Sequence, residues 1–576
     1  MNAVEIDGLT YTYPGVPQPT LRDISLQIPK GDFLAVVGNN GCGKSTLCKV
    51  LNGLIPHFVT GAMEGSVRVC GLNTLECDVG VLAQKVGYVY QDFENQIVRP
   101  TVLDDASYSC LNYAFPDYLE RGRAALKQCG LEGREEEYVW QLSGGQTHLL
   151  ALAGAVSLRP DILILDEPIA QLDPMHADRI YAVLRDLNEN HGKTILVIEH
   201  HTEYIADFCK HVMLMRDGQV RWMLPAAEAL RRVEELEECN IFPPQVTQAA
   251  YGLRKGGVLP ANVPLPITVA DGEKAFDGLR YIPREKPAPA VPRDENAVSF
   301  QNVSLSYRSV KGEPHTVFDG LDLDIRKGEK VALIGSNGAG KSTLMKLMVG
   351  LLKPNTGTVS LFGEAIDDKK AEDLSRQISL VYQNPEEMFI KDSIRADIAY
   401  AMEVRNVPEW EKRTGELLER FRLTELADRD GRLMSGGQMR RASLAIGIAL
   451  NPGILLLDEP TANLDIATRR EIMAVLSDMK DIIQTAVIAT HDMQLVCQWA
   501  ERIIVLCNGQ VVADGAPKQV FQDVEGLRSV GLTVPETTQL MWELRQEGLD
   551  VPLDALNDEE CAAALKELLC SVEHKA

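Results

Sequence analysis

The sequence predicts an α/β fold that occurs twice along one chain. Glycine-rich loops at residues 38–46 and 335–343 each follow a short apolar run and precede a helix-like run. Each half also has an apolar run that ends in Asp-Glu, at residues 162–167 and 454–459. A strand, a glycine-rich loop and a helix, followed by a second buried strand ending in acids, are typical of an open sheet that binds ligands at the carboxyl ends of its strands.

Both glycine-rich loops have the spacing of a phosphate-binding P-loop. Glycine lets the backbone fold around an anion, so that successive N–H groups and the helix start point at phosphate oxygens. Lys44 can then reach the β- and γ-phosphates, while the Ser45 hydroxyl can bind Mg²⁺. One such loop could be a chance match, but two in the same context predict that the chain binds nucleoside triphosphate. The candidate nucleotide-binding residues of the loops are Gly38, Asn39, Asn40, Gly41, Cys42, Gly43, Lys44, Ser45 and Thr46, and Gly335, Ser336, Asn337, Gly338, Ala339, Gly340, Lys341, Ser342 and Thr343.

Length and composition limit the class of protein. At ~150 residues per domain, 576 residues predict about four structural units. The net charge of −24 argues against nucleic acid as a partner and against unaided adhesion to an anionic membrane. The twelve cysteines lack ligand-like spacing and are expected to be reduced thiols. Neither a signal peptide nor an apolar run long enough to span a bilayer is found, so we expect a cytosolic protein that can dock on a membrane partner.

The two halves form an internal repeat. Gly335 lies 297 positions after Gly38, and from Gln91 and Gln383 onwards equivalent residues lie 291 or 292 positions apart. We therefore expect homologous domains at residues 1–233 and 297–524.

A second repeat follows each of these domains. The six residues Pro244, Thr247, Gln248, Leu253, Arg254 and Gly257 recur 291 positions later as Pro535, Thr538, Gln539, Leu544, Arg545 and Gly548. We predict small helical extensions at residues 234–278 and 525–576. Between the repeats, residues 279–296 contain four prolines and are expected to form an extended tether.

The acids at the two strand ends are the candidate catalytic machinery. Asp166 and Asp458 can hold Mg²⁺, usually through water, because each lies at a carboxyl edge that faces a P-loop. Glu167 and Glu459 can polarise the attacking water as general bases.

A Ser-Gly-Gly-Gln sequence precedes a helix-like run in each half. A serine and two glycines at a helix start present a hydroxyl and free N–H groups to an anion. These candidate nucleotide-binding residues are Ser143, Gly144, Gly145 and Gln146, and Ser435, Gly436, Gly437 and Gln438.

With these motifs in this order, each half resembles the ATP-binding cassette (ABC) ATPases over nearly its whole length. The resemblance implies two tandem P-loop NTPase domains with α-helical signature subdomains. It implies that Tyr13 and Tyr307 stack on adenine, and that the glutamines Gln91 and Gln383 contact Mg²⁺ and sense a membrane partner.

The resemblance also implies how the two cassettes cooperate. It assigns Asp173 and Asp465 to communication across the paired cassettes, and His200 and His491 to the γ-phosphate. In this family two cassettes close head to tail, which here would pair loop 38–46 with 435–438 and loop 335–343 with 143–146. Both halves keep the glutamate and the histidine, so we predict that both hydrolyse ATP. Unequal rates remain open, because 147–149 is Thr-His-Leu where 439–441 is Met-Arg-Arg.

Three interpretations of the tandem arrangement compete. Residues 87–98 are similar to the glutamine loop of energy-coupling factor (ECF) ATPases, 381–389 is a looser copy, and the duplicated tail resembles their C-terminal extension. This interpretation implies a peripheral ATPase on the cytoplasmic face of the cell membrane. It would bind a transmembrane coupling subunit and a substrate-binding membrane subunit of a vitamin or metal-cation importer.

The alternatives are the tandem ATPase of a sugar importer, which resembles this chain less at the glutamine loop and lacks the tail, and a soluble translation factor. The latter needs a long, basic linker to reach RNA, whereas this linker is rich in proline and the chain is acidic.

Overall fold

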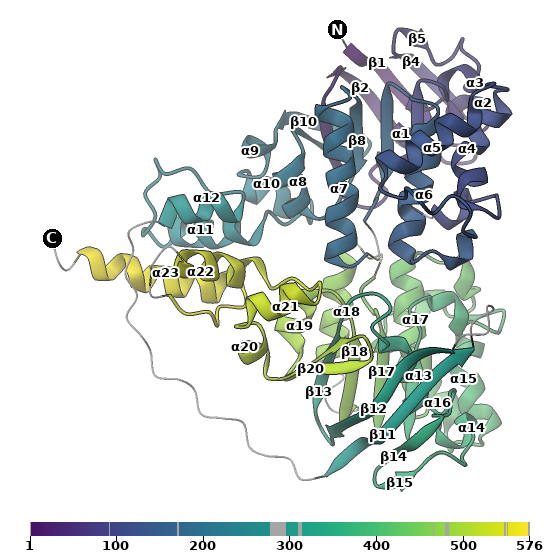
Figure 1. Cartoon of the computed structure of the whole chain (residues 1–576), viewed down its shortest axis with the longest axis vertical. Coiled ribbons are helices and arrows are strands. Elements are labelled where there is room, and N and C mark those ends of the chain that lie inside the picture. Colours follow the sequence, from purple (N-terminus) through teal and green to yellow (C-terminus); the bar gives the residue numbers. More distant parts are fainter. Residues whose placement is uncertain are drawn as a thin grey trace. The chain divides into compact units, whose positions relative to one another are not determined.

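The computed structural model describes residues 2–91, 93–169, 172–276, 295–308, 314–462, 464, 466–478, 483–546, 549 and 551–573. The chain divides into two compact units, Met1–Asp277 and Gly278–Ala576, which run from purple to teal and from teal to yellow in Figure 1. The proline-rich tether, apart from its last two residues, lies outside the described residues, as does Gly548 of the tail repeat.

The first unit contains a four-stranded antiparallel sheet and a six-stranded mixed sheet. The antiparallel sheet has the order β2-β1-β4-β5, with β1 Asn2–Thr12, β2 Leu21–Pro29, β4 Ala62–Val69 and β5 Leu72–Asn73. The mixed sheet has the order β10-β9-β3-β8-β7-β6, with β3 Phe33–Val37, β6 Val86–Val89, β7 Ile162–Asp166, β8 Thr194–Ile198, β9 His211–Arg216 and β10 Gln219–Pro225. All neighbours in it are parallel except β9 and β10.

Strand β3, which leads into the first P-loop, lies inside this mixed sheet and is buried on both faces. Phe33, Ala35 and Val37 face one hydrophobic core, while Leu34 and Val36 face another. Alternate side chains of a strand point to opposite faces, so a continuous apolar run is what two covered faces require.

Helices surround the two sheets of the first unit (Figure 1). Helices α4, α5 and α6 pack against one another and form the helical subdomain. The helices are α1 Lys44–Leu51, α2 Leu54–His57, α3 Val79–Leu82, α4 Val102–Asn112, α5 Tyr118–Gln128, α6 Gly144–Ser157, α7 Pro174–Glu189, α8 Thr202–Phe208, α9 Ala226–Ala229, α10 Val233–Glu238, α11 Gln245–Lys255 and α12 Val269–Phe276, with short 3₁₀ helices η1 Phe93–Gln96 and η2 Val139–Gln141.

The second unit repeats this architecture strand for strand. Its antiparallel sheet has the order β12-β11-β14-β15, with β11 Asn296–Arg308, β12 Pro314–Arg326, β14 Thr356–Leu361 and β15 Glu364–Ala365. Its mixed sheet has the order β16-β17-β18-β13-β19-β20, with β13 Lys330–Ile334, β16 Ile378–Val381, β17 Ile454–Asp458, β18 Thr485–Ala489, β19 Arg502–Cys507 and β20 Gln510–Gly515.

The helices of the second unit follow the same order along the chain. They are α13 Lys341–Met348, α14 Ala371–Leu374, α15 Ile394–Val404, α16 Trp410–Arg420, α17 Gly436–Ile448, α18 Ile466–Asp478, α19 Met493–Trp499, α20 Pro517–Val520, α21 Val524–Ser529, α22 Glu536–Gln546 and α23 Asp558–Glu573, with 3₁₀ helices η3 Pro385–Met388, η4 Thr424–Leu426 and η5 Gly431–Leu433.

The tail repeat forms corresponding helices, α11 and α22, each followed by a loop and a further helix. The hydroxyl of Thr247 donates to the carbonyl of Pro266 at 2.7 Å, and that of Thr538 donates to the carbonyl of Ala555 at 2.9 Å. The predicted fold class, a duplicated α/β domain with helical subdomains and tails, is thus confirmed, while the exact boundary between each domain and its tail stays a prediction.

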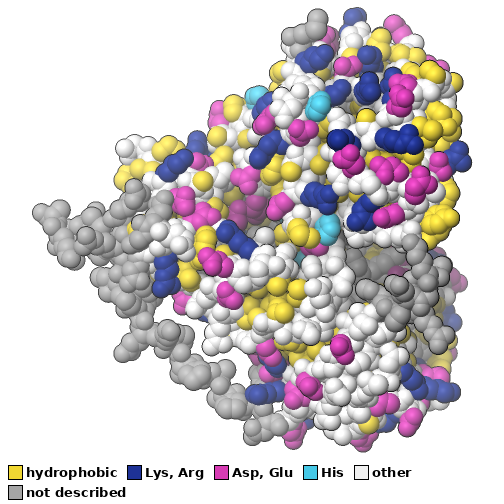
Figure 2. All heavy atoms as spheres, viewed as in Figure 1, with side chains coloured by type: hydrophobic (Ala, Val, Ile, Leu, Met, Phe, Trp, Pro, Cys, Tyr) yellow, Lys and Arg dark blue, Asp and Glu magenta, His cyan; other side chains and the backbone are white. Residues whose placement is uncertain are grey.

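The hydropathy of the helices and the charges on the surface are two further features of the structure. Among the described residues, no helix combines the length and the apolar character needed to cross a bilayer. On the face shown in Figure 2, the Lys and Arg side chains of the first unit are interspersed with Asp and Glu.

Candidate functional site

The first P-loop has a backbone that only glycine fits at two points. Gly38 has φ 151°, and a Cβ there would lie 2.2 Å from the carbonyl oxygen of Met215 on β9. Gly43 has φ 104° and caps helix α1 in the left-handed conformation. The loop therefore turns tightly from β3 into α1, which leaves backbone N–H groups and the helix start available for an anion.

The P-loop lysines occupy the concave side of their loops. Lys44 Nζ donates to the carbonyls of Gly38 at 2.6 Å and Asn39 at 3.1 Å, and its side chain is buried. Lys341 makes the equivalent bonds to Gly335 and Ser336 at the same distances. Each ammonium group thus already lies inside the loop that is expected to receive phosphate.

Strand β7, which ends in Asp166, reaches the P-loop although β7 is not the neighbour of β3 in the sheet. Strand β8 separates β7 from β3, yet the Asp166 carboxylate at the end of β7 accepts a hydrogen bond from the Ser45 hydroxyl. Burial raises the pKa of Asp166, the charge of Glu167 adds to the rise, and the Ser45 hydrogen bond opposes it. A bound cation would relieve this unfavourable burial of charge.

The second unit has the same arrangement. The Ser342 hydroxyl hydrogen-bonds the Asp458 carboxylate, whose pKa is raised by burial and by the charge of Glu459. A hydroxyl and a carboxylate at the mouth of a phosphate loop are the few oxygen ligands that Mg²⁺ takes from proteins when triphosphate and water supply the others. The donor sets therefore fit Mg²⁺.

Glu167 lies at the centre of a hydrogen-bonded group. Its Oε2 accepts from Gln91 Nε2 at 2.8 Å, and its Oε1 lies 3.0 Å from His200 Nε2. Burial would raise the pKa of Glu167, but the hydrogen bond and the charge of His200 outweigh it, so the pKa lies below its ordinary value. The carboxylate is thus kept ionised, as a general base requires.

Glu459 has a related but different environment. Its Oε1 lies 3.0 Å from Nδ1 of His491, whereas Glu167 faces the Nε2 atom of its histidine. Burial lowers the pKa of His491, but the neighbouring Glu459 carboxylate outweighs it and the pKa is raised. Arg440 donates to the backbone carbonyls of Tyr382 at 2.9 Å and Gln383 at 2.6 Å, which fixes the second glutamine loop.

The aromatic residue expected at adenine lies beside the first P-loop. The Tyr13 hydroxyl is 3.2 Å from Thr46 Oγ1, and its ring meets that of Tyr11 edge-on at 4.9 Å. In the second unit Tyr307 lies on β11, opposite His315 of β12, and is 41% exposed.

Each Ser-Gly-Gly-Gln sequence begins the central helix of its helical subdomain. Ser143 caps α6, accepting from the N–H of Gln146 at 3.4 Å, while the Gln146 side chain accepts from the N–H of Ser143 at 3.0 Å. Ser435 and Gln438 repeat this capping box at α17. The serine and the glutamine thus fix the first turn of each helix, and the binding of an anion by these helix starts stays a prediction.

Asp173 is buried within its own unit as the cap of helix α7. It accepts from the N–H of His176 at 3.0 Å and lies 2.7 Å from Nδ1 of the same residue. The His176 ring in turn packs on Gly145, where a Cβ would lie 2.1 Å from its Cδ2 atom. Asp465, its predicted counterpart, lies outside the described residues.

Four side chains that support these groups have roles that the motifs do not predict: His176, Arg440, Tyr181 and Glu199. The first packs on Gly145 and the second holds the Gln383 loop. Glu199 accepts a hydrogen bond from the backbone N–H of His200, and Tyr181 donates a hydrogen bond to Glu199. A signal was present for Arg440 and Glu199, because each differs from its counterpart in the other half, His148 and Thr490.

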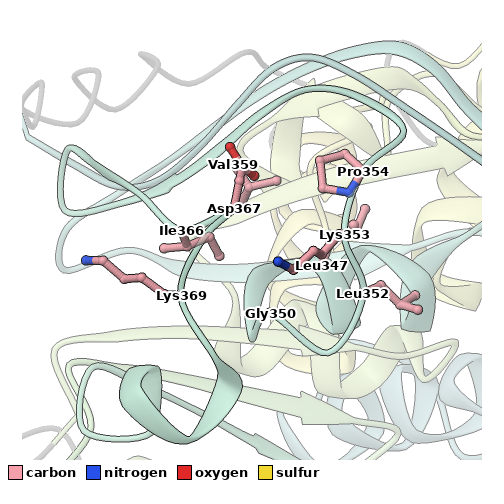
Figure 3. Close-up of a pocket in the computed structure, with 9 residues that line it drawn as sticks. All are labelled: Leu347, Gly350, Leu352, Lys353, Pro354, Val359, Ile366, Asp367 and Lys369. Carbon is pink, nitrogen blue, oxygen red and sulfur yellow. The ribbon is translucent and has the colours of Figure 1, made fainter.

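A small surface pocket of the second unit is separate from this chemistry. Figure 3 shows it between the end of α13, strand β14 and the loop after β15, lined by Leu347, Gly350, Leu352, Lys353, Pro354, Val359, Ile366, Asp367 and Lys369. It adjoins the carboxyl end of α13, whereas the P-loop adjoins the amino end. The pocket therefore has no part in the candidate nucleotide site.

Comparison with known proteins identifies the family. The model of the ABC transporter family matches residues 21–170 and 318–462, one segment in each unit. The chain belongs to the ABC transporter family and is a fused pair of its ATP-binding, ATP-hydrolysing domains.

Relatives match almost the whole chain. A putative ABC transporter ATP-binding protein of Methanosarcina acetivorans is 32% identical over 567 residues, covering 95% of this chain and 91% of that protein. A putative HMP/thiamine import ATP-binding protein of Bacillus subtilis, YkoD, is 29% identical over 543 residues, covering 92% and 94%. The solved structure of cbiO1 from Clostridium perfringens, described as part of the ABC transporter complex cbiONQ, is 32% identical and covers 43% of this chain and 100% of that chain, with a TM-score of 0.37.

Proposed function

We propose that this chain is the ATP-hydrolysing energy-coupling subunit of an ECF-type importer for a vitamin or a metal cation. The glutamine-loop sequence at 87–98 and the duplicated tail helices support this proposal. So does the extensive match to an import ATP-binding protein whose name gives HMP and thiamine as its cargo.

One observation carries the coupling mechanism. Gln91 donates to Glu167, and Glu167 also contacts His200, so the glutamine loop is joined to the candidate base by one side-chain hydrogen bond. A displacement of this loop by a membrane subunit would move or release the carboxylate. Loop movement and hydrolysis would thereby be linked in both directions.

The chemistry assigned to each centre is positioning and charge stabilisation. The P-loop N–H groups and Lys44 hold the phosphates, and the Glu167 carboxylate accepts the proton of the attacking water. His200 holds the γ-phosphate and orients that carboxylate. Lys341, Glu459 and His491 act likewise in the second centre.

Mg²⁺ would supply charge neutralisation between the phosphates. Its protein ligands, direct or through water, would be Ser45, Asp166 and Gln91 in one centre and Ser342, Asp458 and Gln383 in the other. Each ATP would be completed by the Ser-Gly-Gly-Gln sequence of the other unit: 435–438 for the first P-loop and 143–146 for the second. Tyr13 and Tyr307 would stack on adenine, and Asp173 and Asp465 would link the two centres.

The partners follow from this assignment. We place the chain on the cytoplasmic face of the cell membrane, bound to a transmembrane coupling subunit that carries a substrate-binding membrane protein. The transported molecule would be recognised by that membrane protein and not by this chain.

Purification of the tagged full-length chain from gently solubilised membranes tests the proposal. We expect one polytopic coupling subunit and a second, small membrane protein to copurify, and to be identified by mass spectrometry. The comparison is the same tag on a variant with Gln91→Ala and Gln383→Ala, which should recover less of both membrane proteins, because these glutamines belong to the loops that are proposed to contact the coupling subunit. Recovery with ribosomes, or with two similar large membrane subunits and no small one, would contradict the ECF assignment.

A further inference from the structure

A buried acid lies directly before the histidine of the first unit. Glu199, at the carboxyl end of β8, is 2% exposed. Its Oε1 accepts hydrogen bonds from the backbone N–H groups of His200 at 2.8 Å and His201 at 2.9 Å. The Glu199 side chain therefore holds the backbone of His200, the candidate γ-phosphate ligand, through hydrogen bonds.

Tyr181 of helix α7 completes this support. Its hydroxyl donates to the other carboxylate oxygen of Glu199, Oε2, at 2.8 Å, and the tyrosine is fully buried. Its ring stacks with Phe33 of β3 at 6.4 Å, and with Tyr204 at 4.8 Å, while Phe208 lies 4.9 Å away in a tilted arrangement. The pair thus joins the P-loop strand, the helix that Asp173 caps and the helix that follows the histidines.

Packing alone gives no reason for a carboxylate at this position. Burial raises the pKa of Glu199, and a buried charge is unfavourable unless specific hydrogen bonds compensate for it. Here both carboxylate oxygens accept hydrogen bonds: Oε2 from Tyr181, and Oε1 from the backbone N–H groups of His200 and His201. The side chain is therefore suited to fix that segment in one position.

The second unit does not contain this pair. Thr490 and Met473 stand at the equivalent positions. Thr490 Oγ1 accepts from the N–H of Asp492 at 3.0 Å, and Asp492 caps α19 and pairs with Arg469 at 3.1 Å. The two histidines also present different ring nitrogens to their glutamates, Nε2 for His200 and Nδ1 for His491.

We propose that Glu199 and Tyr181 are positioning residues that hold His200 against Glu167, and that they make the first hydrolytic centre differ from the second. The inference rests on the proposed roles of Glu167 and His200 in hydrolysis. Glu199 and Tyr181 act through the histidine, because their hydrogen bonds go to its backbone and to each other.

The test measures steady-state ATP hydrolysis by the full chain in a Glu459→Gln background, where turnover reports the Glu167 centre. Tyr181→Phe, which removes one hydroxyl, and Glu199→Thr, which copies the second unit, should each lower kcat about tenfold with an unchanged KM for ATP. Glu199→Gln should stay within about twofold, because its amide oxygen can still accept from both N–H groups. In a Glu167→Gln background, which reports the other centre, Tyr181→Phe should leave kcat unchanged.

Unchanged kcat for Tyr181→Phe and Glu199→Thr in the Glu459→Gln background would overturn the inference. So would equal losses in both backgrounds, because these would indicate general damage to the fold. If Glu199→Thr does not fold, Tyr181→Phe decides the matter alone. Failure of the proposed role of the glutamates in hydrolysis is distinguishable, because a Glu167→Gln/Glu459→Gln double variant would then still hydrolyse ATP.

Discussion

The two candidate general bases share an unusual backbone. Glu167 has φ 50° and Glu459 has φ 45°, in the left-handed region that residues other than glycine seldom adopt. Each N–H donates to the last residue of the next strand, Ile198 at 3.0 Å and Ala489 at 2.9 Å. Such a conformation costs about 1–3 kcal/mol and is kept where it directs a functional side chain. In both units it turns the carboxylate toward the histidine.

His148 provides a prediction on pH at the scale of a single residue. Burial lowers the pKa of His148 to about 4, and its ring lies 3.4 Å from that of Phe93 in the glutamine loop. The unfolded chain, with a histidine pKa of about 6.5, binds more protons, so the stabilisation declines as the pH falls below about 6.5. When the pH is lowered from 7.5 to 5, the free energy of unfolding should therefore decrease by about 2 kcal/mol less in His148→Gln than in the wild type.

Urea unfolding at the two pH values measures this difference. The matched comparison is His191→Gln, which removes an exposed imidazole by the same substitution and is measured at the same two pH values. Equal losses in the wild type and His148→Gln would show that His148 is not buried as described.

The residues that could be predicted from the sequence are those with fixed spacing. The P-loop lysines, Asp166 and Glu167 each follow a recognisable strand or loop, and the structure brings them together. The environment of Glu199 could not be predicted, because Tyr181 lies 18 positions away and meets it only once α7 packs on β8. For the same reason the contact between the His148 and Phe93 rings, which are tilted against each other, carries no local sequence signal.

At the scale of elements, the start of helix α6 depends on the absence of one side chain. The ring of His176 lies against Gly145, whereas a Cβ at Gly144 would meet nothing within 4 Å. Gly437 is similarly close to its neighbour, with Thr468 Cγ2 at 2.4 Å from the position of a Cβ. The second glycine of each Ser-Gly-Gly-Gln sequence therefore lets α6 pack closely against α7, and α17 pack closely against α18.

Gly145→Ala should destabilise the chain by about 1–3 kcal/mol, because the imidazole of His176 must leave its place beside Asp173. Gly144→Ala, one residue earlier, should be neutral or slightly stabilising, because alanine favours the helix. Thermal unfolding of both variants without nucleotide makes the comparison. A Gly145→Ala variant as stable as Gly144→Ala would contradict this packing.

The order of strands is the part of the elements that sequence could not supply. Apolar runs before the P-loop and before Asp-Glu predict β3 and β7 correctly, but the run at 194–198 carries no sign that it lies between them. Strand order depends on how the crossover helices pack on the sheet, and periodicity within one segment contains no information about that.

At the scale of the whole molecule, the two units share one fold but differ in the residues that support their candidate sites. Strand order is the same in both units, yet the supports of the glutamine loop and of the histidine differ: His148 and Glu199 in one, Arg440 and Thr490 in the other. Both units nevertheless keep a P-loop lysine, an acid pair and a histidine. We therefore expect both centres to hydrolyse ATP, at rates that differ.

The most direct measurement is steady-state ATP hydrolysis by the wild type, Glu167→Gln, Glu459→Gln and the double variant, each with Mg²⁺. Each single variant should lose about half of kcat or more, and the double variant should fall about 10²–10⁴-fold, the usual contribution of a general base. Full turnover in one single variant would show that its centre is catalytically idle. Turnover that survives in the double variant would show that these glutamates do not activate the attacking water, and would contradict the account.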